Sequence, residues 1–172
     1  MFREWDNFYL LVGGAAGALI GLMFVVATLT TEAQTKRPAL GVQIFITPIV
    51  FHFGVVLVVS ALAAVPGLAL SSVGVLLAFL AALGFAYSTM TTAKLFGAQL
   101  ESSPDWSDKC FYGILPMIAY LGLAAAAGAV WLAPKSAAYG VAAIMLVLLL
   151  IGIRNAWDLA TFFVQRMQKP EK

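Results

Sequence analysis

The sequence predicts an all-α, polytopic membrane protein, with five transmembrane helices in one compact bundle that takes up residues 1–172. Of these 172 residues, 62% are hydrophobic and only 10% are charged, whereas soluble domains carry about 25% charged residues. The hydrophobic residues gather in segments long enough to cross the hydrocarbon core of a bilayer. These segments make the lipid bilayer the expected partner. A net charge of +2 is too small to indicate nucleic acid as a partner.

The first span is expected over residues 9–29. The start of the chain lacks a purely basic region and runs directly into this segment, so we expect no cleavable signal peptide. Glycines recur at every fourth position, which places a smooth strip on one helix face and lets another helix approach closely. This strip predicts packing within the bundle, with an oligomer seam as the alternative, and its members are Gly13, Gly17 and Gly21.

The second and third spans are expected over residues 47–65 and 72–94, as a tight helical hairpin. Thr47-Pro48 is typical of a helix start, with Thr as the N-cap and Pro in the first helical position. Residues 38–93 contain no Asp, Glu, Lys or Arg. That run is too long for a single span, and Pro66-Gly67 indicates the turn inside it.

The fourth and fifth spans are expected over residues 111–132 and 137–163. Pro116 lies inside the fourth span and removes the hydrogen bond to the carbonyl of Tyr112, which predicts a kink. Membrane helices tolerate such a proline when neighbouring groups satisfy the freed carbonyl. Small residues form a second close-packing face on the fourth span, and they include Gly122 and Gly128.

The orientation follows from the basic residues between the spans, because cytoplasmic segments of membrane proteins carry an excess of Lys and Arg. The side with the loops at 30–46 and 95–110 and the C-terminal tail holds seven basic residues, and the other side holds two. We therefore expect the C-terminus in the cytoplasm and the N-terminus outside. The seven are Lys36, Arg37, Lys94, Lys109, Arg166, Lys169 and Lys172, and the two are Arg3 and Lys135.

Polar residues inside the predicted spans form the candidate functional site. Residues 152–158 bring an Arg, an Asn and an Asp together in a membrane helix, where an arginine costs at least about 2.5 kcal/mol. Arg154 and Asp158 are four residues apart and can pair on one helix face. The whole set is expected at one depth, in the cytoplasmic half of the bilayer: His52, Tyr87, Ser88, Thr91, Tyr120, Arg154, Asn155 and Asp158.

Two interpretations of this polar set stay open. In the structural one, Arg154 and Asp158 neutralise each other and the other groups bond across helices, so that the set fixes the packing. In the functional one, the intramembrane charges line a water-accessible cavity or an ion path. His52 alone is more typical of a helix-packing donor than of a proton relay.

Several classes of site have no support in the sequence. There is no phosphate-binding loop, and one His and one Cys exclude an intramolecular disulfide, a cysteine-based metal site and a His pair for haem or metal within one chain. A Ser–His arrangement that uses Ser60 or Ser88 lacks any supporting motif. We therefore predict no metal, no cofactor and no catalytic residue, and we do not expect an enzyme.

Four stretches resemble a family of small bacterial integral membrane proteins with five helices. They are WDNFYLLVGG at residues 5–14, GLMFVV at 21–26, TPIVFHF at 47–53 and GIRNAWD at 152–158. The similarity covers most of the chain. It implies a multi-pass protein of the bacterial inner membrane, and it carries over no catalytic residue.

Two functions compete at this point. The first is a homo-oligomeric pore that conducts ions or small solutes, supported by the polar set and the small-residue faces. The second is a non-catalytic accessory or assembly subunit of a larger membrane complex, supported by the small size and the lack of a soluble domain. The expected partners are accordingly further copies of the chain or other membrane subunits, and the sequence narrowly favours the pore.

Overall fold

Long helices make up almost all of the computed structural model, which describes residues 5–33, 40–97 and 105–167, with only the backbone described for 29–33, 40–44 and 163–167. The elements are α1 (Asp6–Ala33), α2 (Leu40–Ala64), α3 (Leu70–Gly97), α4 (Trp106–Lys109), the π-helical turn η1 (Cys110–Ile114), α5 (Leu115–Ala129) and α6 (Pro134–Met167). Five helical stretches are long and apolar enough to cross a membrane, with α4, η1 and α5 together forming the fourth. The predicted fold class, an all-α membrane protein with five transmembrane helices in one compact bundle, is confirmed.

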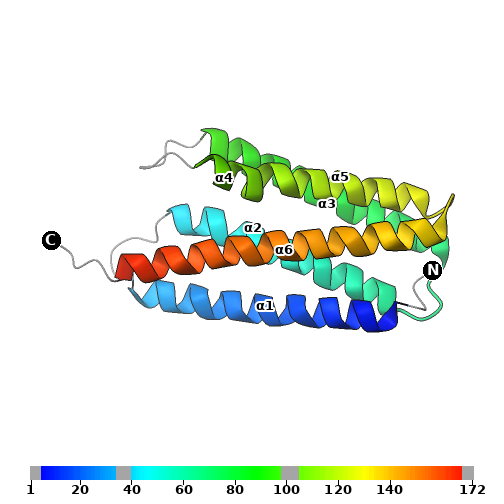
Figure 1. Cartoon of the computed structure of the whole chain (residues 1–172), viewed down its shortest axis with the longest axis horizontal. Helices are drawn as coiled ribbons and strands as arrows, with labels where there is room; N and C mark the ends of the chain where they lie inside the picture. Colours follow the sequence, from blue (N-terminus) through cyan, green and yellow to red (C-terminus); the bar gives the residue numbers. More distant parts are fainter. Residues whose placement is uncertain (1–4, 34–39, 98–104, 168–172) are drawn as a thin grey trace.

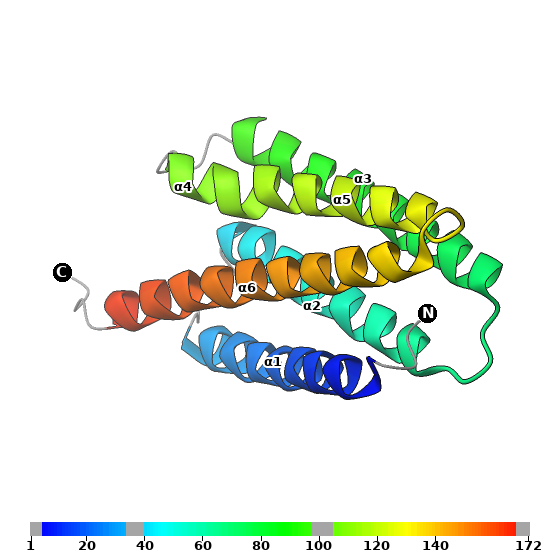
Figure 2. The same ribbon diagram turned by 45° about the vertical axis from the view of Figure 1, so that its right-hand side comes forward.

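The helices pack in two groups (Figures 1 and 2). α1 lies against α2, and α3 lies along α5. α6 packs against both α5 and α2 and so joins the two groups. Because the number of spans is odd, α6 ends at the opposite end of the bundle from the one where α1 begins (Figure 1). The end that holds the C-terminus of α6 also holds α4 and the start of α2.

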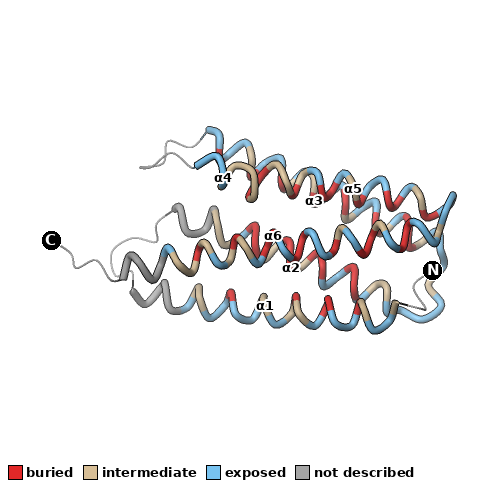
Figure 3. The backbone as a smooth tube through the Cα atoms, viewed as in Figure 1, coloured by how far each residue is buried: buried red, intermediate tan, exposed pale blue. Residues whose placement is uncertain are grey.

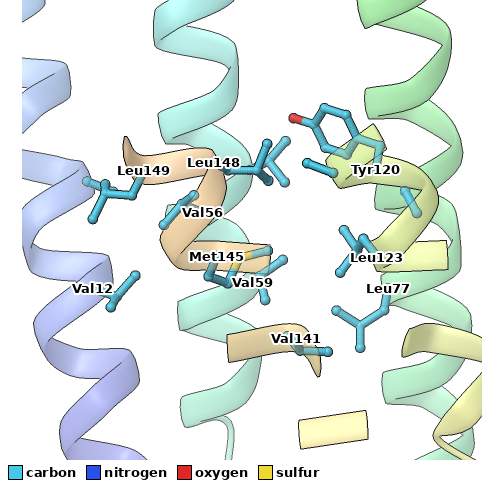
Figure 4. Close-up of a cluster of buried hydrophobic side chains, with 14 of the residues drawn as sticks. Val12, Val56, Val59, Leu77, Tyr120, Leu123, Val141, Met145, Leu148 and Leu149 are labelled. Carbon is cyan, nitrogen blue, oxygen red and sulfur yellow. The ribbon is translucent and has the colours of Figure 1, made fainter. Parts of the chain in front are cut away.

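An apolar core runs along the middle of the bundle. Buried positions recur on the inward face of the helices, while α1 leaves most of its surface exposed (Figure 3). Apolar side chains from all five spans meet in the close-up of Figure 4, and the labelled ones are Val12, Val56, Val59, Leu77, Tyr120, Leu123, Val141, Met145, Leu148 and Leu149. In a bilayer such contacts act through van der Waals packing, because lipid chains are as apolar as the core itself.

The start of the second span differs from the prediction at Thr47-Pro48. α2 begins at Leu40, so Pro48 lies inside the helix and does not open it. A membrane helix tolerates an internal proline where neighbouring helices cover the weakened turn, and Pro48 is buried. Since α1 also continues to Ala33, most of the loop expected over residues 30–46 is helical.

The second and third spans are joined as predicted, yet they do not form a tight hairpin. Gly67 adopts a positive φ of 73°, which a residue without a side chain enters at no steric cost, and it makes the turn between the two helices. Beyond the turn α2 and α3 separate, because the main neighbour of α3 is α5 and the main neighbour of α2 is α1. Figure 2 shows the wide connection between them.

The small-residue faces divide into positions that touch another helix and positions that do not. A Cβ atom at Gly13 would lie 2.8 Å from Cβ of Ser60, and one at Gly122 would lie 2.7 Å from Cδ1 of Ile144. These two glycines therefore permit close approach within the chain. The remaining three have nothing within 4 Å of such an atom and do not mediate close packing inside the bundle: Gly17, Gly21 and Gly128.

Candidate functional site

The structure separates the predicted polar set into two clusters at different depths. Arg154, Asn155 and Asp158 lie with η1 near the end of the bundle where α6 ends. His52 and Tyr120 meet farther inside. Tyr112, which belongs to the first cluster, lies eight positions before Tyr120 on the fourth span, and this corresponds to about 12 Å along a helix. The expectation of a single depth is therefore wrong.

Arg154 is surrounded by groups that satisfy its charge. Its Nη1 lies 3.0 Å from Oδ2 of Asp158, and its Nη2 donates to Oγ of Ser107 at 2.8 Å. The guanidinium also lies over the ring of Phe111, with Cζ 3.8 Å from the ring centroid, which is a cation–π contact. The predicted pairing of Arg154 with Asp158 is confirmed. Both side chains keep partial exposure, 31% and 40%, so the pair also faces the surface of the bundle.

Asn155 is completely buried, and it both donates a hydrogen bond to the fourth span and accepts one from it. Its Nδ2 donates to the carbonyl of Phe111 at 3.0 Å, and its own backbone carbonyl accepts from the hydroxyl of Tyr112 at 3.0 Å. A third, longer contact of 3.4 Å joins its Oδ1 to Nη1 of Arg154, within α6. The side chain thus ties α6 to η1.

The position of that bond follows from Pro116. The N–H of Leu115 donates to the carbonyl of Cys110, five residues back, as a π-helical turn requires. At the same spacing, the N–H that Pro116 lacks would have met the carbonyl of Phe111. The sequence predicted that Tyr112 would lose its donor. The wider turn moves the open carbonyl to Phe111, and Asn155 fills it.

His52 and Tyr120 form the inner cluster. Nδ1 of His52 lies 2.9 Å from the hydroxyl of Tyr120, and the two side chains are 1% and 0% exposed. His52 comes from α2 and Tyr120 from α5, so the bond joins the two groups of helices (Figure 4 shows Tyr120). The ring of Tyr120 lies directly against Gly84 of α3, where any side chain would collide with it.

Aromatic rings cover this inner pair on the side of α3. Phe51 stacks on Tyr87 with centroids 4.1 Å apart, and Phe51 also lies edge-on to His52 at 5.8 Å. Tyr87 is therefore a ring partner of α2. Thr91 uses its hydroxyl locally and donates to the carbonyl of Tyr87 at 3.1 Å, so it makes no bond across helices there.

Ser88 is 1% exposed, and its hydroxyl has no hydrogen-bond partner among the described residues. The hydroxyl of Ser60, which lies against Gly13, also has no hydrogen-bond partner among these residues. Neither serine is bonded to His52. The Ser–His arrangement therefore has no geometric support in the described residues.

Four residues that contact the two clusters are not among those predicted from the sequence: Ser107, Phe111, Phe51 and Gly84. An isolated serine or phenylalanine near a span carries no pattern that reveals its partner. Gly84 had a signal, since an isolated glycine inside an apolar helix often marks a close contact. Within the described residues no group of three or more His, Cys, Asp or Glu side chains is placed to hold a metal ion.

Searches for similar proteins among family models, curated proteins and solved structures give no significant match to this chain.

Proposed function

We propose that this multi-pass membrane protein is a non-catalytic accessory or assembly subunit of the bacterial cytoplasmic membrane. The observation that carries the proposal is that Arg154, Asn155 and His52 bind groups of other helices within a single chain. Arg154 and Asn155 are used to hold α6 on the fourth span, and His52 is used to hold α2 on α5. Groups engaged in this way stabilise the packing and are not turned toward a path through the chain.

A homo-oligomeric pore is the second candidate, and the surface of α1 favours it. Gly14 and Gly21 are exposed, and a side chain at either position would meet nothing within 4 Å. They leave a smooth surface on the span with the smallest buried share, and small residues let helices of two copies approach closely. Ions or small solutes would then pass between copies.

The orientation proposed is a cytoplasmic C-terminus and an external N-terminus. It is supported by the excess of seven basic residues over two. In the structure Lys94 and Lys109 belong to the helix ends near α4, while Lys135 is the second residue of α6 at the other end. Reporter fusions at both termini test this, and a cytoplasmic N-terminus would contradict it.

Purification of the full chain in mild detergent separates the two candidates. An accessory subunit is expected to co-purify in fixed ratio with other membrane chains and to show no ion flux in liposomes. A pore is expected to form a discrete homo-oligomer and to conduct. Gly21→Leu should disrupt the homo-oligomer while leaving the fold intact, because the position has free space.

Gly128→Leu is the matched control for that experiment. Gly128 is also exposed and also has nothing within 4 Å, but it lies on α5. A monomer without co-purifying chains and without flux would contradict both candidates.

A further inference from the structure

The fourth span and α2 face each other at two levels. At the inner level His52 bonds to Tyr120. At the outer level the ring of Phe45 lies edge-on to Tyr112, with centroids 5.0 Å apart. Phe45 precedes His52 by seven residues and Tyr112 precedes Tyr120 by eight, so the outer level lies about 10 to 12 Å nearer to the end of the bundle.

The outer level is closed by two adjacent residues of α6. Arg154 contacts Ser107 and Phe111, and Asn155 bonds to Phe111 and to Tyr112. We call these two residues and their contacts the latch. All of the contacts are polar or cation–π, and the ion pair within them is partly exposed to the outside. Such bonds are individually weak, typically about 1 kcal/mol each.

The two facing helices, α2 and the fourth span, each contain a proline between the outer and the inner level. Pro48 lies between Phe45 and His52 on α2, and Pro116 lies between Tyr112 and Tyr120. Each proline removes a backbone bond from its helix, and π-helical turns and prolines are the usual points at which helices bend. Hinge points of the two facing helices thus fall between the outer and the inner level.

We propose that the latch is a gate over the buried His52–Tyr120 pair, which opens when Arg154 and Asn155 release the fourth span. In the closed form His52 is inaccessible. On release, the segment that holds α4 and η1 bends away from α6 at Pro116, and water reaches the imidazole. This goes beyond the proposed function, since either a subunit or a pore can contain such a gate.

Chemical modification of histidine reports on the accessibility of His52 alone, because His52 is the single histidine of the chain. Diethyl pyrocarbonate modifies accessible neutral imidazole, and mass spectrometry of the full-length protein in membrane vesicles gives the rate at His52. Tyr112→Phe removes one latch bond with little change in shape, and the loss of one such bond is expected to raise the rate roughly fivefold. Asn155→Leu removes the bond to the carbonyl of Phe111 but leaves the bond from Tyr112 to the backbone carbonyl of residue 155, so it is expected to raise the rate by a similar factor.

Two controls distinguish opening from general loosening. Tyr139→Phe also removes a hydroxyl from an aromatic ring, but Tyr139 is exposed and lies on the first turns of α6. It should leave the rate at His52 unchanged. In a Cys110→Ser background, a cysteine placed at the buried Val141 should stay unreactive toward a maleimide in every variant.

Unchanged modification of His52 in both Tyr112→Phe and Asn155→Leu would overturn the gate. An equal rise in reactivity at position 141 would also overturn it, since the whole bundle would then be loosening. If Asn155→Leu does not fold, Tyr112→Phe alone decides the result.

Discussion

Asn155 on α6 donates its side-chain amide to the backbone carbonyl of Phe111, 3.0 Å away on the fourth span. A side chain of one helix thereby supplies the donor that Pro116 withholds from another. Asn155 is fully buried and Phe111 is partly buried, and within a membrane a carbonyl without a donor is costly. The polar residue Asn155 in α6 and the turn of the fourth span that lacks a donor at Pro116 therefore stabilise each other.

Replacement of Asn155 is expected to be destabilising only while Pro116 is present. Asn155→Leu leaves the carbonyl of Phe111 without a donor, at a cost of about 1–3 kcal/mol. In a Pro116→Ala background a backbone N–H is restored, and the same change should have a much smaller effect. Thermal unfolding in detergent for the two single variants and the double variant gives the coupling energy. Additive effects of the two changes would mean that Asn155 does not replace the missing donor.

Replacing Arg154 is expected to cost more stability than replacing Asp158. Arg154→Leu removes the contacts with Ser107 and Phe111 together with the ion pair, whereas Asp158→Leu leaves Arg154 with its other partners. The arginine variant should lose more stability, and replacing both residues by leucine should recover part of that loss because no lone carboxylate remains. The measurement is the midpoint of unfolding for all three variants. Equal losses in both single variants would show that the ion pair outweighs the other contacts of Arg154.

Replacement by alanine should destabilise the protein at Gly84 but not at Gly17. A methyl group at Gly84 collides with the ring of Tyr120, and overpacking of this kind typically costs about 1–3 kcal/mol. Gly17 has open space around it, and alanine is the better helix former by about 1 kcal/mol. Unfolding in detergent should therefore show Gly84→Ala destabilised and Gly17→Ala unchanged or slightly stabilised. The reverse order would contradict the close contact between α3 and α5.

The bond between His52 and Tyr120 should show coupling between α2 and α5. Tyr120→Phe leaves Nδ1 of His52 buried without its partner, which costs about 1–3 kcal/mol. Replacing His52 by leucine in the same variant removes the orphaned group and should restore part of the stability. A double-mutant cycle measures this coupling. A coupling energy near zero would show that the two groups stabilise the bundle independently.

The five spans were predictable because their signal is spread over many residues. A run of about twenty apolar residues is independent of any one neighbour, and each span has one. The exact start of α2 was not predictable from Thr47-Pro48, because the same two residues occur at helix starts and inside membrane helices that neighbours support. Tertiary packing decides between the two positions.

The candidate site was predictable in its residue types and partly in its pairing. Arg154 and Asp158 lie on one helix, so their spacing alone reveals the pair. The partners of Asn155 and His52 come from other helices, and their depth depends on how the helices are shifted along one another. That shift is set by contacts such as Tyr120 against Gly84, for which one sequence contains no periodic signal.

The π-helical turn at Cys110–Ile114 has a consequence for changes in chain length. Removing one residue from an ordinary helix turns everything beyond it by about 100°, so an inward face becomes an outward one. A π-helical turn already contains one residue more than an α-helical turn would use. A deletion of one residue there returns the helix to regular geometry and leaves Ser107 and Tyr120 on the sides that they occupy now. Single-residue deletions should therefore be tolerated in this turn and rejected throughout α3 and α6.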